Sequence, residues 1–193
     1  MKLSIAVVAA MLFASAAPLH AEPSQPVISR SIVKQMVDIR QAADKHDWET
    51  VIAECDAARQ VPGISTYDAF VIDRFLGMAY FGLGDHDRAA GAFYAAVTSG
   101  AAPVDDVKQI LNPTLALLSE RQDNEKIIEL NERLRDVVAS DEEANSFVAI
   151  AYFNLRDKTY ARKYARRSAD LAAQAGKEPQ AVVVQILNFT GGD

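Results

Sequence analysis

Beyond Ser29, apolar residues recur at intervals of three and four along the chain, which is the period of an amphipathic helix. The clearest example is the stretch 76–97, LGMAYFGLGDHDRAAGAFYAAV. Its first half predicts a helix that ends at Gly84, where glycine adopts a left-handed backbone without strain. Its second half predicts another helix, and small alanines would let the two pack closely. The pattern therefore predicts an all-α protein built from helical hairpins.

The same hairpin recurs along the chain. Four residues occupy equivalent places just after the hairpin turn: Val51, Ala89, Ile127 and Ala161. They are 38, 38 and 34 residues apart. Such self-similarity at a nearly fixed period is the signature of a repeat architecture, so we expect four copies of one helix–turn–helix unit.

The second copy resembles a tetratricopeptide repeat. The residues that carry the resemblance are Leu76, Gly77, Tyr80, Gly84, Ala89, Phe93 and Ala96. It implies an all-α fold, an α-solenoid of antiparallel helix pairs wound into a superhelix, as a single domain over residues 31–189. The expected repeats cover about 31–60, 66–99, 104–138 and 141–174, and a C-terminal capping helix covers 179–189, with Val182, Val183, Ile186 and Leu187 packed on the fourth copy.

Local signals predict where several of these helices begin. Ser65 or Thr66 is expected to cap the second copy, and Ser140 with Glu143 reads as a capping box for the fourth. Pro113 falls inside the first helix of the third copy, so we expect a bend or a late helix start there. Pro179 is expected in the first turn of the capping helix.

The first residues have the layout of a secretory signal peptide. Lys2 precedes an apolar core over residues 3–13, and small residues follow up to Ala21. We expect a signal peptide over 1–21 and a flexible linker over 22–30, with an uncleaved membrane anchor as the alternative. The layout resembles that of small exported tetratricopeptide-repeat proteins of Gram-negative bacteria, which implies a periplasmic location, or secretion.

Composition and chemistry exclude several functions. The formal net charge of −6 argues against a nucleic-acid binder. The single cysteine, Cys55, cannot form an intrachain disulfide and is expected to be a small buried hydrophobe. His46 and His86 both lie at turns, where polar residues are ordinary. With no catalytic motif in the sequence, we expect no enzyme, no catalytic residue, no cofactor and no metal.

The resemblance implies that the first helix of each copy lines a concave groove. The residues it maps there are Met36, Arg40, Arg74, Met78, Phe81, Asn112, Ser146, Ile150 and Phe153. Methionine and aromatic side chains beside arginine suit an extended segment or an amphipathic helix. We therefore expect a non-catalytic interaction module, a monomer or weak homodimer, that binds a protein or peptide of the cell envelope. The Lys-and-Asn clamp that some family members use for a terminal carboxylate is not reproduced.

An alternative contact surface lies on the second helix of the fourth copy. Its basic residues are Arg162, Lys163, Arg166 and Arg167, which helical spacing places on one face. Such a face suits anionic lipid head groups or an acidic protein. The alternative function is therefore a membrane- or wall-associated structural protein with peripheral membrane contact.

Overall fold

The computed structural model describes residues 26–191 of the chain. The predicted signal peptide, residues 1–21, lies outside the described residues, as do residues 22–25 of the predicted linker. Residues 26–29 have no regular secondary structure, and the short 3-10 helix η1 follows at Arg30–Ile32.

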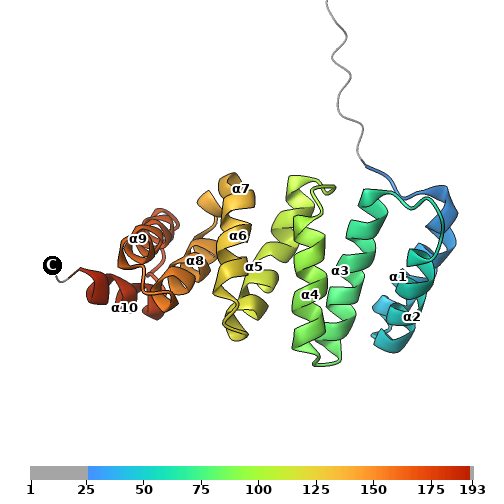
Figure 1. The fold of residues 1–193 in the computed structure, drawn as a ribbon, viewed down its shortest axis with the longest axis horizontal. Helices are drawn as coiled ribbons and strands as arrows, with labels where there is room; N and C mark the ends of the chain where they lie inside the picture. Colours follow the sequence, from blue (N-terminus) through green and yellow to red (C-terminus); the bar gives the residue numbers. More distant parts are fainter. Residues whose placement is uncertain (1–25, 192–193) are drawn as a thin grey trace, which may run out of the picture.

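The described residues contain ten α-helices and no strand. The helices are α1 (Val33–Asp44), α2 (Trp48–Arg59), α3 (Thr66–Gly82), α4 (His86–Thr98), α5 (Val104–Glu120), α6 (Asn124–Arg133), α7 (Arg135–Ala139), α8 (Glu142–Asn154), α9 (Lys158–Gln174) and α10 (Ala181–Thr190). Figure 1 shows them following one another along the long axis of the molecule in chain order. The prediction of an all-α protein is confirmed for residues 26–191.

The helices pack in neighbouring pairs. Contacts are most extensive between α8 and α9 and between α3 and α4, followed by α1 and α2. Helix α10 packs on both α8 and α9. We call α1, α3, α5, α8 and α10 the first helices. The second helices are α2, α4, α6 with its continuation α7, and α9.

The turn inside each pair has the same backbone in all four pairs. A residue with positive φ, which is His46, Gly84, Gln122 or Arg156, precedes the aspartate at the N-cap of the second helix. The N–H of that aspartate donates to the carbonyl five residues earlier, at 2.9–3.0 Å. The left-handed Gly84 is confirmed, and three non-glycine residues adopt the same conformation at the cost of Cβ strain.

Close packing between α3 and α4 depends on small residues. A Cβ atom added to Gly77 would lie 2.5 Å from Cδ1 of Phe93, so the aromatic ring occupies the space that the glycine leaves. Ala79, Ala89 and Ala96 are fully buried around it. The helix axes can therefore approach closely, and dispersion contacts are dense.

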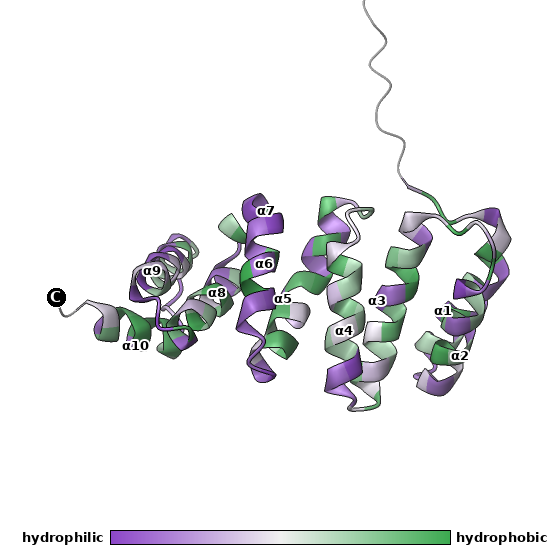
Figure 2. Ribbon diagram, viewed as in Figure 1, coloured by the Kyte–Doolittle hydropathy of each residue, from purple (hydrophilic) through white to green (hydrophobic). Residues whose placement is uncertain are grey.

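The core extends along the array as three clusters of buried residues, one in the middle and one toward each end. Figure 2 shows α3 as more hydrophobic than α6. Cys55 is fully buried in the cluster formed with α1 and α3, as predicted, and burial raises the pKa of its thiol to about 12. The thiol is therefore protonated and inert at neutral pH.

Helix α5 is continuous through Pro113, so the prediction of a late helix start there is wrong. The proline leaves the carbonyl of Gln109 without its usual helical N–H partner. Leu111 and Leu115 are buried on either side of it, and the buried Thr114 hydroxyl donates to the carbonyl of Ile110 at 2.5 Å. Tertiary packing thus outweighs the local penalty.

The predicted helix starts have mixed outcomes. Ser65 caps α3 in a complete capping box with Asp68, as expected. The capping box at Ser140 is wrong: Asp141 caps α8 by accepting from the N–H of Ala144, whereas the Ser140 hydroxyl donates to the carbonyl of Val137. The carboxylate is the stronger acceptor for an orphan N–H at a helix N-terminus.

The last helix begins later than expected. Gln180 is the N-cap of α10, so Pro179 precedes the helix and does not lie in its first turn. The expected packing of this helix is confirmed, because Val183 and Ile186 are buried against α8 and α9, and Val182 and Leu187 are partly buried beside them. Among the described residues, no helix combines the length and the apolar character that a bilayer crossing requires.

Candidate functional site

A cleft opens between α1 and α3, the first helices of the first two pairs. Its volume is about 370 Å³. Met36 and Arg40 of α1 line it, as do Val37 from the same helix and Phe75 from α3. Two residues of the predicted groove therefore lie together in a mostly apolar cleft, whose lining also includes Gln41 and Asp44.

Farther along α3, two predicted groove residues expose apolar surface. Met78 is 37% exposed and Phe81 is 54% exposed. The Phe81 ring stacks on the His86 ring with centroids 5.4 Å apart, and His86 in turn contacts the Glu120 carboxylate at 3.0 Å. The Phe81 side chain is thereby held in one orientation while much of its surface remains in contact with water.

Side-chain hydrogen bonds connect α3 to α5, α5 to the N-cap of α8, and α8 to the N-cap of α10. Arg74 of α3 donates to Gln109 of α5 at 3.1 Å, and Asn112 of α5 donates to Asp141, the N-cap of α8, at 3.2 Å. Ser146 of α8 bonds Gln180, the N-cap of α10, at 3.2 Å. Ser146 is only 2% exposed. These three predicted groove residues join the first helices and hold them in register.

A second and larger cleft lies between α8 and α10, with a volume of about 680 Å³. Ile150 and Phe153 of α8 line it together with Ile186 and Phe189 of α10. The rings of Phe153 and Phe189 meet edge to face with centroids 5.8 Å apart, and Phe189 is 71% exposed. The last two predicted groove residues thus lie together in a strongly apolar cleft.

Large exposed hydrophobic side chains gather on the first helices. Within the described helices they are Val33 and Val37 of α1, Met78 and Phe81 of α3, Val104 of α5, Val184 and Phe189 of α10, and Tyr160 of α9. Tyr160 is the only one on a second helix. We call the exposed apolar residues of α1, α3 and α10, together with the two clefts, the first-helix face. Sequence reasoning missed Val33, Val37 and Phe189 there, although their helical spacing from buried neighbours was a usable signal.

No protein-family model, curated protein or solved structure matches this chain. The resemblance to tetratricopeptide repeats therefore depends on the sequence pattern alone.

The two histidines and the cysteine of residues 26–191 lie apart from one another, each against aromatic or hydrophobic side chains. No group of three or more His, Cys, Asp or Glu side chains in residues 26–191 is placed to hold a metal ion. His46 meets the edge of Trp48, whereas His86 stacks on Phe81, so each histidine contacts an aromatic ring near its own turn. Cys55 is buried and protonated.

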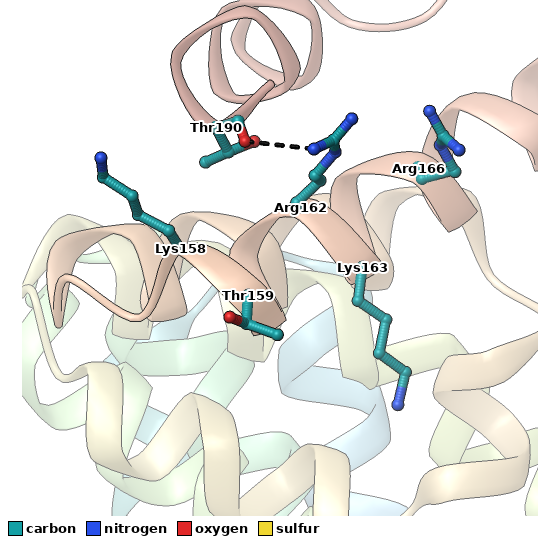
Figure 3. A pocket seen from close by; sticks show the side chains of 6 residues that line it. All are labelled: Lys158, Thr159, Arg162, Lys163, Arg166 and Thr190. Atoms are coloured by element: carbon teal, nitrogen blue, oxygen red, sulfur yellow. Dashed lines mark hydrogen bonds between the residues drawn. The ribbon is translucent and has the colours of Figure 1, made fainter. Parts of the chain in front are cut away.

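The structure separates the four residues of the alternative basic surface. Figure 3 shows Arg162 and Arg166 directed to one side of α9, where Arg162 donates to the carbonyl of Thr190 at 3.3 Å, and Lys163 directed to the other side. Arg167 donates to the carbonyl of Ala139 in α7 at 2.8 Å. None of the four forms a salt bridge with a carboxylate of the described residues. The basic side chains therefore lie on two sides of α9 and do not form one face.

Proposed function

We propose that this protein is a non-catalytic interaction module of the tetratricopeptide-like solenoid type, and that it binds a segment of another protein along its first-helix face. The signal-peptide pattern of residues 1–21 supports a partner in the cell envelope, in the periplasm or beyond. The single observation that carries the proposal is the segregation of exposed hydrophobic side chains onto the first helices.

Exposed apolar side chains on a soluble protein are ordinary when they are scattered, and meaningful when they are gathered. Here they occur on α1, α3, α5 and α10, while among the second helices only α9 exposes a large hydrophobic side chain, that of Tyr160. The free energy gained by covering such side chains is the main source of affinity in protein interfaces, at roughly 25 cal/mol per Å² of apolar surface. A partner that covers the first-helix face would therefore gain the most binding free energy.

The arrangement also favours a preformed site. Hydrogen bonds from Arg74, Asn112 and Ser146 link the first helices from α3 to α10. A partner that binds between them would not have to order this scaffold, so less of the interaction free energy is lost to conformational entropy. An amphipathic helix or an extended segment with apolar side chains at regular intervals fits such spacing.

The proposal is tested with a displayed library of peptides, selected for binding to the protein. Met78→Asp places a charge in the first-helix face, and Ala95→Asp places the same charge on an exposed position of α4. We expect selected peptides to have apolar residues at helical or extended spacing. We also expect Met78→Asp to weaken their binding about tenfold or more, the effect of losing an interface anchor. Equal weakening by Ala95→Asp, or none by Met78→Asp, would refute the assignment of this face.

A further inference from the structure

A third cleft lies away from the first-helix face, between α6–α7 and α9. Its volume is about 340 Å³, which falls within the range of small-molecule sites of about 300–1,000 Å³. One wall comes from α6 and α7 through Asn131, Glu132 and Arg135. The opposite wall comes from α8 and α9. The sequence did not reveal this cleft, because its two walls come from different repeats.

Three stacked tyrosines form the wall on α8 and α9. The Tyr152 ring stacks on Tyr160 with centroids 5.0 Å apart and on Tyr164 with centroids 5.6 Å apart. The Asn131 amide donates to the Tyr164 hydroxyl at 2.8 Å and fixes that ring across the cleft. Burial, together with the neighbouring tyrosines and carboxylates, raises the pKa of Tyr152, so its phenol is neutral at physiological pH. The tyrosines therefore offer a rigid aromatic surface.

Three cationic side chains surround that surface. The Lys163 ammonium lies 5.4 Å from the Tyr160 centroid and 5.5 Å from the Tyr164 centroid, within cation–π range. Arg167 is held by its bond to the carbonyl of Ala139, which leaves its terminal nitrogens available. Arg135 makes no hydrogen bond or salt bridge with its side chain in the described residues. Glu132 is the one acidic residue in the lining, so cations outnumber carboxylates by three to one in a chain whose formal net charge is −6.

We propose that this cleft is a binding site for a small organic phosphate, a phosphate monoester that carries an apolar or aromatic body. Arginine guanidinium groups bind phosphate oxygens through paired, charge-assisted hydrogen bonds. A monoester near its dianionic form balances the excess of positive charge in the lining. The tyrosine faces cover the organic body, which gives the cleft a preference for a monoester over inorganic phosphate. This site is independent of the first-helix face, since its walls come mainly from second helices.

The experiment uses phenyl phosphate as the probe and follows tyrosine ring resonances of the full protein by NMR during titration. We expect saturable shifts confined to tyrosines of the cleft, weaker binding of inorganic phosphate, and no binding of neutral phenol. Arg135→Gln removes a cation without breaking a contact of the fold. It should weaken phenyl phosphate about tenfold, which corresponds to about 1.4 kcal/mol and is typical for a hydrogen bond to a charged group.

Arg166→Gln is the matched control, since Arg166 lies on α9, is exposed, and lies outside the lining of this cleft. It should change the dissociation constant by less than about twofold, the scale expected for a screened surface charge. Equal losses from Arg135→Gln and Arg166→Gln would overturn the proposal in favour of diffuse electrostatic attraction. Absence of saturable shifts would overturn it outright, and inorganic phosphate binding as tightly as phenyl phosphate would overturn the role given to the tyrosines.

Discussion

The hairpin α3–α4 and the hairpin α5–α6 share one turn geometry but differ in how their helices hold together. In α3–α4, Gly77 receives the Phe93 ring, and the contacts between the two helices are among the most extensive in the molecule. In α5–α6, contacts within the pair are few, and α6 packs more against α8 than against α5. The second helix of this pair is also interrupted at Leu134, where α7 begins.

The difference teaches that the repeat pattern specifies the turn, while the residue at one buried position decides how tightly the pair closes. Phe93, Asn131 and Ala165 stand at equivalent places after the turn, and all three are buried. Phe93 fills the gap beside a glycine, whereas Asn131 directs its amide to Tyr164 of the next pair. The third pair therefore depends on its neighbours, which suits a position between the two ends of the array.

The largest expected effect comes from truncating the equivalent buried residues. Phe93→Ala should lower the free energy of unfolding by about 3–5 kcal/mol, because it leaves a cavity that Gly77 cannot fill. Asn131→Ala should lower it by only about 1 kcal/mol, the net contribution of one hydrogen bond. Urea denaturation followed by circular dichroism measures both. Similar losses for the two variants would contradict the contrast drawn between the pairs.

Pro113→Ala tests how much the internal proline destabilises α5. Alanine restores an N–H for the carbonyl of Gln109 and removes the ring clash, and proline in a helix interior costs about 3 kcal/mol relative to alanine. We expect the free energy of unfolding to rise by about 1–3 kcal/mol. The lower part of this range allows for the extra conformational freedom that the unfolded chain gains when proline is replaced. A thermal melt of the variant beside the parent protein decides this, and a lower melting temperature would count against the account.

The positive-φ residues of two turns can be exchanged, glycine for glutamine in one and glutamine for glycine in the other. Gln122→Gly should raise the free energy of unfolding by about 1 kcal/mol, since glycine adopts positive φ without a Cβ penalty. Gly84→Gln should lower it by about the same amount for the same reason. Measurement of both variants under one denaturant series checks the sign of each. Two changes of the same sign would show that the turns are not equivalent.

The N-terminus of α8 includes the variant with the smallest expected effect. Asp141→Ala should destabilise the protein by about 1–2 kcal/mol, because Asp141 caps α8 and also accepts from Asn112. Ser140→Ala should change stability by less than about 0.5 kcal/mol, as is usual for an exposed position. Differential scanning calorimetry of the pair distinguishes them. A larger loss from Ser140→Ala would restore the capping box that the sequence suggested.

Periodicity alone was sufficient to locate the four turns and the paired helices. It could not specify the cap of α8, because Ser140 and Asp141 are both good caps and the choice depends on tertiary contacts with Asn112. In α1, Asp38 pairs with Lys34, while the adjacent Ile39, which has the same place before the turn as Gly77 in α3, is fully buried.

The candidate site was predictable only in part. Seven of the nine predicted residues lie at the clefts and junctions of the first helices, because helical spacing fixes which residues share a side, whereas Met78 and Phe81 line neither cleft. The exposure of each side chain was not predictable. Met78 and Ser146 were both predicted to line the groove, but Met78 is exposed and Ser146 is buried. The cleft lined by the three tyrosines was not predicted. Arg135 and Tyr160 line one cleft only because α6 and α7 pack beside the last helix pair.

The measurement that tests the central claim most directly is site-specific photo-crosslinking in the native host, with probes at Met78 and Phe81 and control probes at Ala95 and Arg166. The adducts are identified by mass spectrometry. The account predicts one discrete protein adduct from the two positions on the first-helix face and none from Ala95 or Arg166. Adducts from Ala95 or Arg166, with none from Met78 and Phe81, would contradict the claim that the first-helix face holds the partner.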